Sequence, residues 1–166
     1  MLSVLAGPDL RSPISLPENG SIFRQSLERD LKGVRIAWSA DLGGLPVDSR
    51  VTETLEKQRE VFEDLGCIVE EGFPDFTDAD EIFKTFRAWF FELKLASLLP
   101  EHREKMKETV IWNIESGMKL SGPELGRAEV KRTALFHRVQ EFMQNYDFLA
   151  LPVSQVPPFS LEQEYV

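Results

Sequence analysis

The pattern of apolar and polar positions between residues 34 and 71 predicts a strand, a helix and a second strand. The run 34–38 is rich in β-branched and aromatic residues, which is typical of strands. Asp48 is suited to cap a helix. After it, apolar residues recur on one helical face, at Val51, Leu55, Phe62 and Leu65. Gly66 then favours a stop before a second strand from Cys67, so the segment predicts a right-handed βαβ unit with adjacent, parallel strands.

The segment 77–145 has the spacing of several amphipathic helices. Thr77 is the expected cap of the first, which is apolar around more than half of its circumference and should therefore be covered on two sides. A charged turn and a shorter helix follow, and Ser121 with Glu124 forms the capping-box pattern of a long helix over 122–145. The nearly continuous apolar run 147–153 predicts a third strand, buried on both faces.

These elements predict an α/β fold with a partial mixed sheet of about three strands and several helices. We expect one partial domain, whose segments are an irregular lead-in (1–33), the βαβ unit (34–71), the helical region (77–145), the late strand (146–153) and a loop (154–166). A doubly wound sheet usually has about five or six strands, so the chain is expected to be a portion of a larger α/β fold. A small self-sufficient domain is the alternative.

Composition restricts the classes of partner. Of 166 residues, 42% are hydrophobic and 28% charged, which is typical of a globular chain. The 19 basic and 28 acidic residues give a net charge of −9, which repels phosphate backbones and anionic lipids, so neither nucleic acid nor a membrane is an expected partner. The single cysteine, Cys67, excludes an internal disulfide and, with the globular composition, favours a cytoplasmic protein.

Common catalytic and metal-binding motifs are absent from the sequence, including phosphate-binding loops, zinc-protease helices and the nucleophile elbow of hydrolases. The two histidines, His102 and His137, are expected to be solvated or packed. An acidic cluster at 75–81 lacks the glycine and terminal glutamate of a calcium loop. We therefore predict no catalytic residue, no metal site and no cofactor.

Two features are candidates for substrate binding. Phe86, Trp89 and Phe90, with Trp89 as the leading candidate, belong to an aromatic helix that can line an apolar pocket for an acyl or aryl group. Ordinary core packing is the alternative for each of them. Ser154 and Gln155 directly follow the third strand, and open α/β sheets bind ligands beyond the carboxyl ends of strands. The alternative for Ser154 and Gln155 is that they belong to an ordinary loop and do not bind substrate.

Several segments resemble those of the amidase signature family. Residues 4–13 contain LAGPD followed by RSP and are similar to a segment that follows the catalytic serine region in that family. Residues 32–37, 46–51 and 65–70 resemble its βαβ insertion. The run YDFLALPV at 146–153, with the prolines at 157 and 158, resembles its late strand and pocket loop. The likeness covers nearly the whole chain in the right order.

The resemblance implies an enzyme that hydrolyses carboxylic amides, or transfers the released ammonia, through a serine, a second serine at a cis peptide and a lysine. This sequence has no Ser-Ser dipeptide. It has eight lysines but no Gly/Ser-rich loop whose serine one of them could activate. The chain is therefore expected to be inactive alone, to line the pocket for a small-molecule amide in the intact enzyme, and to self-associate through uncovered apolar surface. A stand-alone, non-catalytic α/β binding or interaction module is the alternative.

Overall fold

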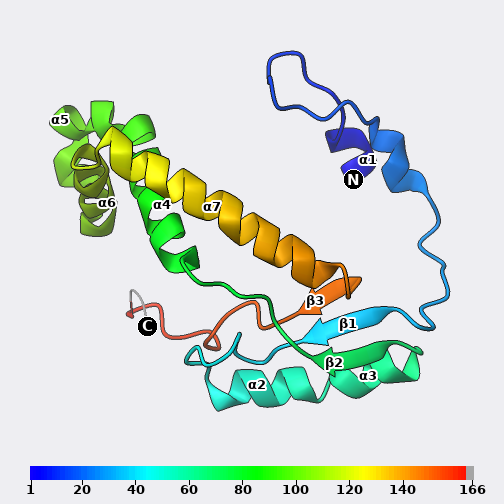
Figure 1. Ribbon diagram of the computed structural model, residues 1–166. Coiled ribbons are helices and arrows are strands. Elements are labelled where there is room, and N and C mark those ends of the chain that lie inside the picture. Colours follow the sequence, from blue (N-terminus) through cyan, green and yellow to red (C-terminus); the bar gives the residue numbers. More distant parts are fainter. Residues whose placement is uncertain (164–166) are drawn as a thin grey trace. The chain divides into compact units, whose positions relative to one another are not determined.

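The computed structural model describes residues 1–163 and divides the chain into two compact units, Met1–Lys32 and Gly33–Val166 (Figure 1). The first unit holds one short α-helix, α1 (Leu2–Leu5), and a 3₁₀ helix, η1 (Gly20–Arg24). Gly20 lies so close to α1 that a Cβ atom there would be 2.4 Å from the carbonyl oxygen of Ala6. The two short helices of this unit therefore pack with their backbones in contact.

The second unit contains a parallel sheet of three strands: β1 (Arg35–Trp38), β2 (Ile68–Glu71) and β3 (Phe148–Ala150). Their order is β2-β1-β3, with β1 in the centre (Figure 1). Arg35 lies opposite Ile68 in the β1–β2 pair, which confirms the adjacent, parallel strands predicted for the βαβ unit. The α/β fold class is confirmed too, although the sheet expected to be mixed is purely parallel within residues 1–163.

The connection between β1 and β2 consists of two helices, α2 (Ser49–Glu56) and α3 (Arg59–Asp64). The predicted cap is confirmed, since Asp48 accepts a 2.9 Å hydrogen bond from the backbone N–H of Arg50. Hydrogen bonds from the Arg50 side chain and backbone lower the pKa of Asp48 to about 2. The expectation of one continuous helix is wrong: the N–H of Gln58 bonds to the oxygen of Leu55, and this tighter i→i−3 turn ends the first helix.

The helical region begins with α4 (Ala79–Leu95), which packs against α6 (Glu108–Met118) and α7 (Gly122–Met143). Between α4 and α6 the chain forms η2 (Ala96–Leu98), α5 (Leu99–His102) and η3 (Arg103–Lys105), so part of the charged segment expected to be a turn is helical. Thr77 is not the cap of α4. Its N–H donates to Asp75 at 2.8 Å, and the helix begins after Asp78, which has a left-handed φ of 70°.

The capping box at the start of α7 is confirmed. The Ser121 hydroxyl accepts a hydrogen bond from the backbone N–H of Glu124, and the Glu124 carboxylate accepts one from the backbone N–H of Ser121 at 2.8 Å. These two bonds satisfy donors that the first turn of a helix otherwise leaves open.

Replacing Ser121 with alanine is expected to lower the free energy of unfolding by about 1 kcal/mol, because the cap bond to the Glu124 N–H is lost. Urea titration followed by circular dichroism measures the change. Ser49→Ala is the matched control, since no hydrogen bond from the Ser49 side chain occurs in residues 1–163. Equal stability of the Ser121 variant and the unmodified chain would show that the box contributes nothing.

The core of the second unit is centred on β1. Ile36, Ala37 and Trp38 are almost fully buried, and Ile114 of α6 is also buried. The expectation that the third strand is buried on both faces is wrong, since Phe148 is 51% exposed. The reason is that β3 is an edge strand, paired only with β1 within residues 1–163.

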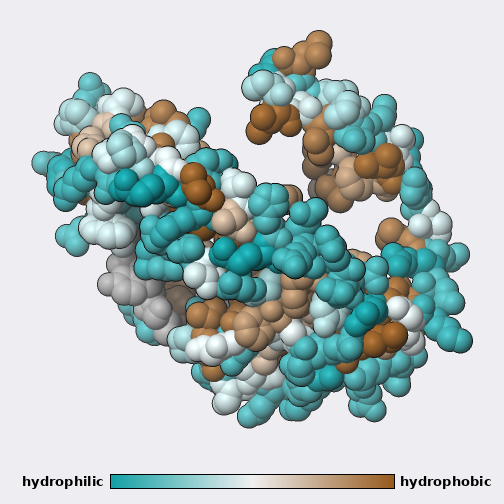
Figure 2. Space-filling model, in the orientation of Figure 1, coloured by the Kyte–Doolittle hydropathy of each residue, from teal (hydrophilic) through white to brown (hydrophobic). Residues whose placement is uncertain are grey.

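The apolar circumference of α4 is only partly covered. Ile82 and Ala88 are buried, whereas Phe83, Phe90 and Leu93 are largely exposed. Figure 2 shows apolar side chains interrupting the polar surface. We expected α4 to be covered on two sides. α6 and α7 cover it where they pack, and the rest of its apolar circumference is exposed. Among the described helices, none has the length and apolar character needed to cross a membrane.

Candidate functional site

The exposed side of α4 forms a hollow of about 550 Å³, which we call the aromatic groove. Its walls include Phe83, Phe86, Trp89 and Phe90 of α4, with Arg132 of α7 at one side. The structure thus brings together the three aromatic residues that the sequence indicated. They lie together because residues three and four positions apart share one face of a helix.

The rings of the groove are held by one another and are partly solvent-accessible. Phe86 and Trp89 meet edge to face, with centroids 6.2 Å apart and an interplanar angle of 74°. Trp89 is 37% exposed and Phe90 53% exposed. Side chains of this size are normally buried in a core, so the groove is an exposed aromatic surface that can pack against a further apolar group.

Two guanidinium groups lie over rings of α4. The Arg132 Cζ atom is 4.7 Å from the centroid of Phe86. Arg87 lies over Phe83 and Phe91, at 5.7 and 5.4 Å. Sequence reasoning did not single out either arginine. In the sequence, Arg87 stands four positions from each of the two phenylalanines, and this spacing predicts contact on a helix. Arg132 belongs to α7, and no spacing in the sequence indicates its contact with Phe86.

Contacts between α7 and the start of α4 fix the position of Arg132. The Lys131 ammonium is 2.5 Å from Glu81 and 3.1 Å from Asp78, and hydrogen bonds to these carboxylates raise the pKa of Lys131. Further along α7, Arg138 donates to the carbonyl oxygens of Asp75 and Thr77. α7 is therefore held at two points against the start of α4 and the residues that lead into it.

The loop after β3 is tied to the loop before α2. The Gln155 side-chain amide donates to the carbonyl oxygen of Pro46 at 2.7 Å, and the backbone carbonyl oxygen of Gln155 accepts from the N–H of Asp48 at 2.8 Å. The Ser154 hydroxyl donates to the carbonyl oxygen of Val156 at 2.9 Å. Both side chains are exposed, yet their polar groups are used to hold the loop at the carboxyl ends of β1 and β3.

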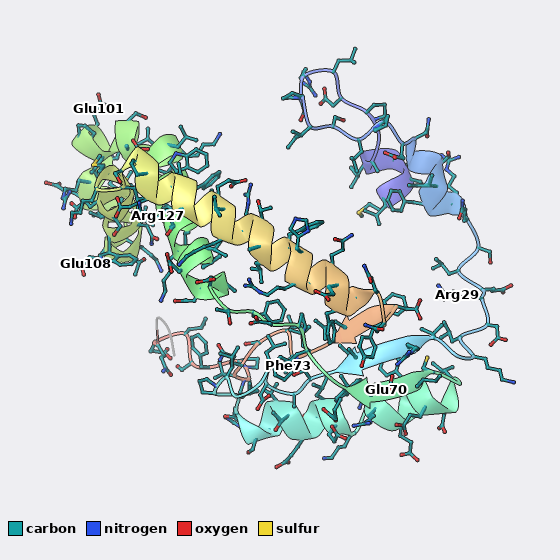
Figure 3. All side chains as sticks on the ribbon, in the orientation of Figure 1. Arg29, Glu70, Phe73, Glu101, Glu108 and Arg127 are labelled. Atoms are coloured by element: carbon teal, nitrogen blue, oxygen red, sulfur yellow. The ribbon has the colours of Figure 1, made fainter. Side chains whose placement is uncertain are left out.

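A ring also packs on the loop before α2. Phe73, labelled in Figure 3, covers Gly43 so closely that a Cβ atom there would lie 2.3 Å from the ring. Gly43 has a φ of +85°, so only glycine fits this position without strain. The loop is therefore fixed by its backbone conformation, by Phe73 and by Gln155.

The structure does not bring the two predicted groups into one cavity. A second cavity of about 710 Å³ lies between the carboxyl ends of β1 and β3 and the helices α2 and α3, with Trp38, Phe62 and Leu151 in its wall. Neither Ser154 nor Gln155 lines this cavity or the aromatic groove.

Within residues 1–163, no group of three or more His, Cys, Asp and Glu side chains is placed to hold a metal ion. The thiol of Cys67 is buried. What the site provides is an aromatic surface flanked by two guanidinium groups, and such a surface binds by packing and by charge.

Comparison with known proteins gives consistent matches. The family model described as Amidase matches residues 1–165. The chain is 29% identical to an acylamidase of Rhodococcus erythropolis in an alignment 166 positions long, which covers 98% of this chain and 35% of that relative. It is 34% identical to a glutamyl-tRNA(Gln) amidotransferase subunit of Streptococcus equi subsp. zooepidemicus (strain H70) over 71 residues, which are 43% of this chain and 14% of that relative.

A solved structure has a similar fold. It is the crystal structure of a bacterial aryl acylamidase belonging to the amidase signature enzymes, with a TM-score of 0.76 and 20% sequence identity. The superposition covers 93% of this chain and 35% of that chain. The chain thus spans about a third of the length of the acylamidases that it matches along nearly its whole length.

Proposed function

Because the chain belongs to the amidase family, we propose that it is the scaffold and pocket-lining portion of an enzyme that hydrolyses carboxylic amides. The aromatic groove carries this proposal, because a partly exposed set of four rings is suited to pack against the apolar group of an amide. The match to an acylamidase over 98% of the chain supports the same reaction class. The substrate is a small-molecule amide.

Within that enzyme, Phe86, Trp89 and Phe90 form a wall on the acyl side of the substrate. Ser154 and Gln155 belong to the loop at the carboxyl end of the sheet, where open α/β folds bind ligands. The Gln155 amide donates a hydrogen bond to the carbonyl oxygen of Pro46. This side chain therefore contributes to the site by holding the loop in place as well as by its position.

The nucleophile lies outside this chain. Amide cleavage by a serine requires a base within hydrogen-bonding distance and donors arranged around the oxyanion. The family's paired serines have no counterpart in this sequence, which lacks a Ser-Ser dipeptide. The rest of the active site is therefore supplied by other parts of the enzyme. We place this enzyme in the cytoplasm.

The purified chain is expected to release no detectable nitroaniline from a chromogenic anilide, because it has neither the nucleophile nor its base. A spectrophotometric assay with an active amidase as the positive control measures this. Hydrolysis that is blocked by a serine-directed fluorophosphonate would contradict the proposal, since it would place a working nucleophile within the chain.

A hydrolase is favoured over an amidotransferase. The match to the glutamyl-tRNA(Gln) amidotransferase covers 43% of the chain, whereas the acylamidase match covers 98%. The intact enzyme should therefore release a free acid together with ammonia or an amine from an amide, with water as the only acceptor. A requirement for an acceptor and for a further protein component would favour the transferase.

The chain alone is expected to self-associate, which distinguishes a pocket-lining portion from a stand-alone binding module. Phe83, Phe90 and Leu93 of α4 and Trp112 of α6 are each more than half exposed, and such surface favours association. Sedimentation velocity over a range of concentrations should show a rising mean mass. A constant monomer mass would favour the module.

A further inference from the structure

The charge around the aromatic groove is opposite to the charge of the chain. The chain carries 28 acidic and 19 basic residues. In the groove, however, the charged lining side chains are Arg87 and Arg132, and no acidic residue is among the lining residues. A hollow of four rings is thus combined with two positive charges in a chain that is otherwise strongly acidic.

Arg87 has no acidic partner in the described part of the chain. The nearby carboxylates of α4 are paired with lysines: Asp80 with Lys84 at 2.7 Å, and Glu81 with Lys131 at 2.5 Å. The Arg87 guanidinium lies over the rings of Phe83 and Phe91. These rings contact the guanidinium without accepting its N–H groups in ordinary hydrogen bonds, so donors suited to a carboxylate stay available.

Arg132 adds to the positive potential on the other side of the groove. Its guanidinium lies over Phe86 and forms one ion pair, with Glu129 at 2.7 Å, on the same helix. That ion pair neutralises part of its charge. Arg87 is therefore the stronger site for an anion, and Arg132 mainly supports the ring beneath it.

We propose that the aromatic groove selects an aromatic group that carries a carboxylate. The aryl part packs on Phe86, Trp89 and Phe90, and the carboxylate is bound by Arg87. This assignment names the substrate class of the site and rests on the proposed function. It predicts that the enzyme prefers amides whose aromatic group is anionic over neutral amides of the same size.

The test compares two probes with the same ring system, 2-naphthoate and 2-naphthamide, on the 166-residue chain. The indole N–H signal of Trp89 in ¹H–¹⁵N spectra, assigned with Trp89→Phe, reports binding to the groove. We expect naphthoate to bind about fivefold more tightly than naphthamide, as one exposed ion pair can provide. Arg87→Gln should remove this difference, so that both probes bind the variant equally.

Arg103→Gln is the matched control, since Arg103 pairs with Glu115 and does not line the groove. It should keep the full preference for naphthoate. Equal binding of both probes to the unmodified chain, or a preference that survives Arg87→Gln, would overturn the charge selectivity and leave the aromatic pocket of the proposed function standing. If neither probe shifts the Trp89 signal, the pocket itself is refuted together with its selectivity.

Discussion

Gly117→Ala is expected to destabilise the chain by about 3 kcal/mol, the upper part of the range for forcing extra volume into a packed interior. Gly117 is buried in α6 where this helix crosses α4. A Cβ atom there would lie 2.2 Å from the carbonyl oxygen of Ala88 and 2.6 Å from the Cβ of Glu92. The nearest of these atoms belongs to the backbone, so the two helices must separate to make room.

Gly126→Ala is the matched control for this substitution. Gly126 lies within α7, and a Cβ atom there meets nothing within 4 Å. Alanine at this position should stabilise the chain by about 0.5–1 kcal/mol through its higher helix propensity. Urea titration of both variants measures the effects. If Gly117→Ala matched Gly126→Ala in stability, the close contact of α4 and α6 would be contradicted.

The contact at Gly117 also decides which side of α4 is open. Ala88 and Glu92 face α6, and Arg132 and Lys131 of α7 approach from another side. The aromatic groove is formed by the face that these two helices leave uncovered. Packing of the helical region therefore produces the groove as well as stabilising it.

Features that depend on residues close in the sequence were predictable. The capping box of Ser121 and Glu124 and the cap at Asp48 each involve residues two or three positions apart. The parallel pairing of β1 and β2 follows from the short βαβ connection, for which a right-handed parallel crossover is the general rule. The i, i+3 and i+4 spacing likewise placed Phe86, Trp89 and Phe90 on one face.

Features that depend on distant parts of the chain were not predictable. The burial of β3 could not be read from its apolar run, because burial depends on what covers the strand and β3 lies at an edge. Arg132 reaches the groove only because Lys131 and Arg138 tie α7 to the start of α4. The cap expected at Thr77 was wrong because Asp78 adopts a left-handed conformation, which is uncommon for a residue other than glycine.

The second large effect is expected for Trp89→Ala in the intact enzyme. Trp89 is 37% exposed at the wall of the groove, so truncation should cost less stability than the loss of a fully buried side chain. The space left by the indole enlarges the groove. The ratio of kcat/KM for bulky over small acyl groups should therefore rise about tenfold, the lower end of what a change in an apolar pocket provides.

Trp112→Ala is the control, because Trp112 is an exposed tryptophan of α6 that does not line the groove. It should leave the preference unchanged. The most direct test of the proposed function is thus the ratio of kcat/KM for a bulky and a small acyl anilide, measured in the unmodified enzyme and both variants. We expect a shift toward the bulky substrate in Trp89→Ala alone. An unchanged preference, combined with a stability loss of about 3–5 kcal/mol, would show that Trp89 only packs the core.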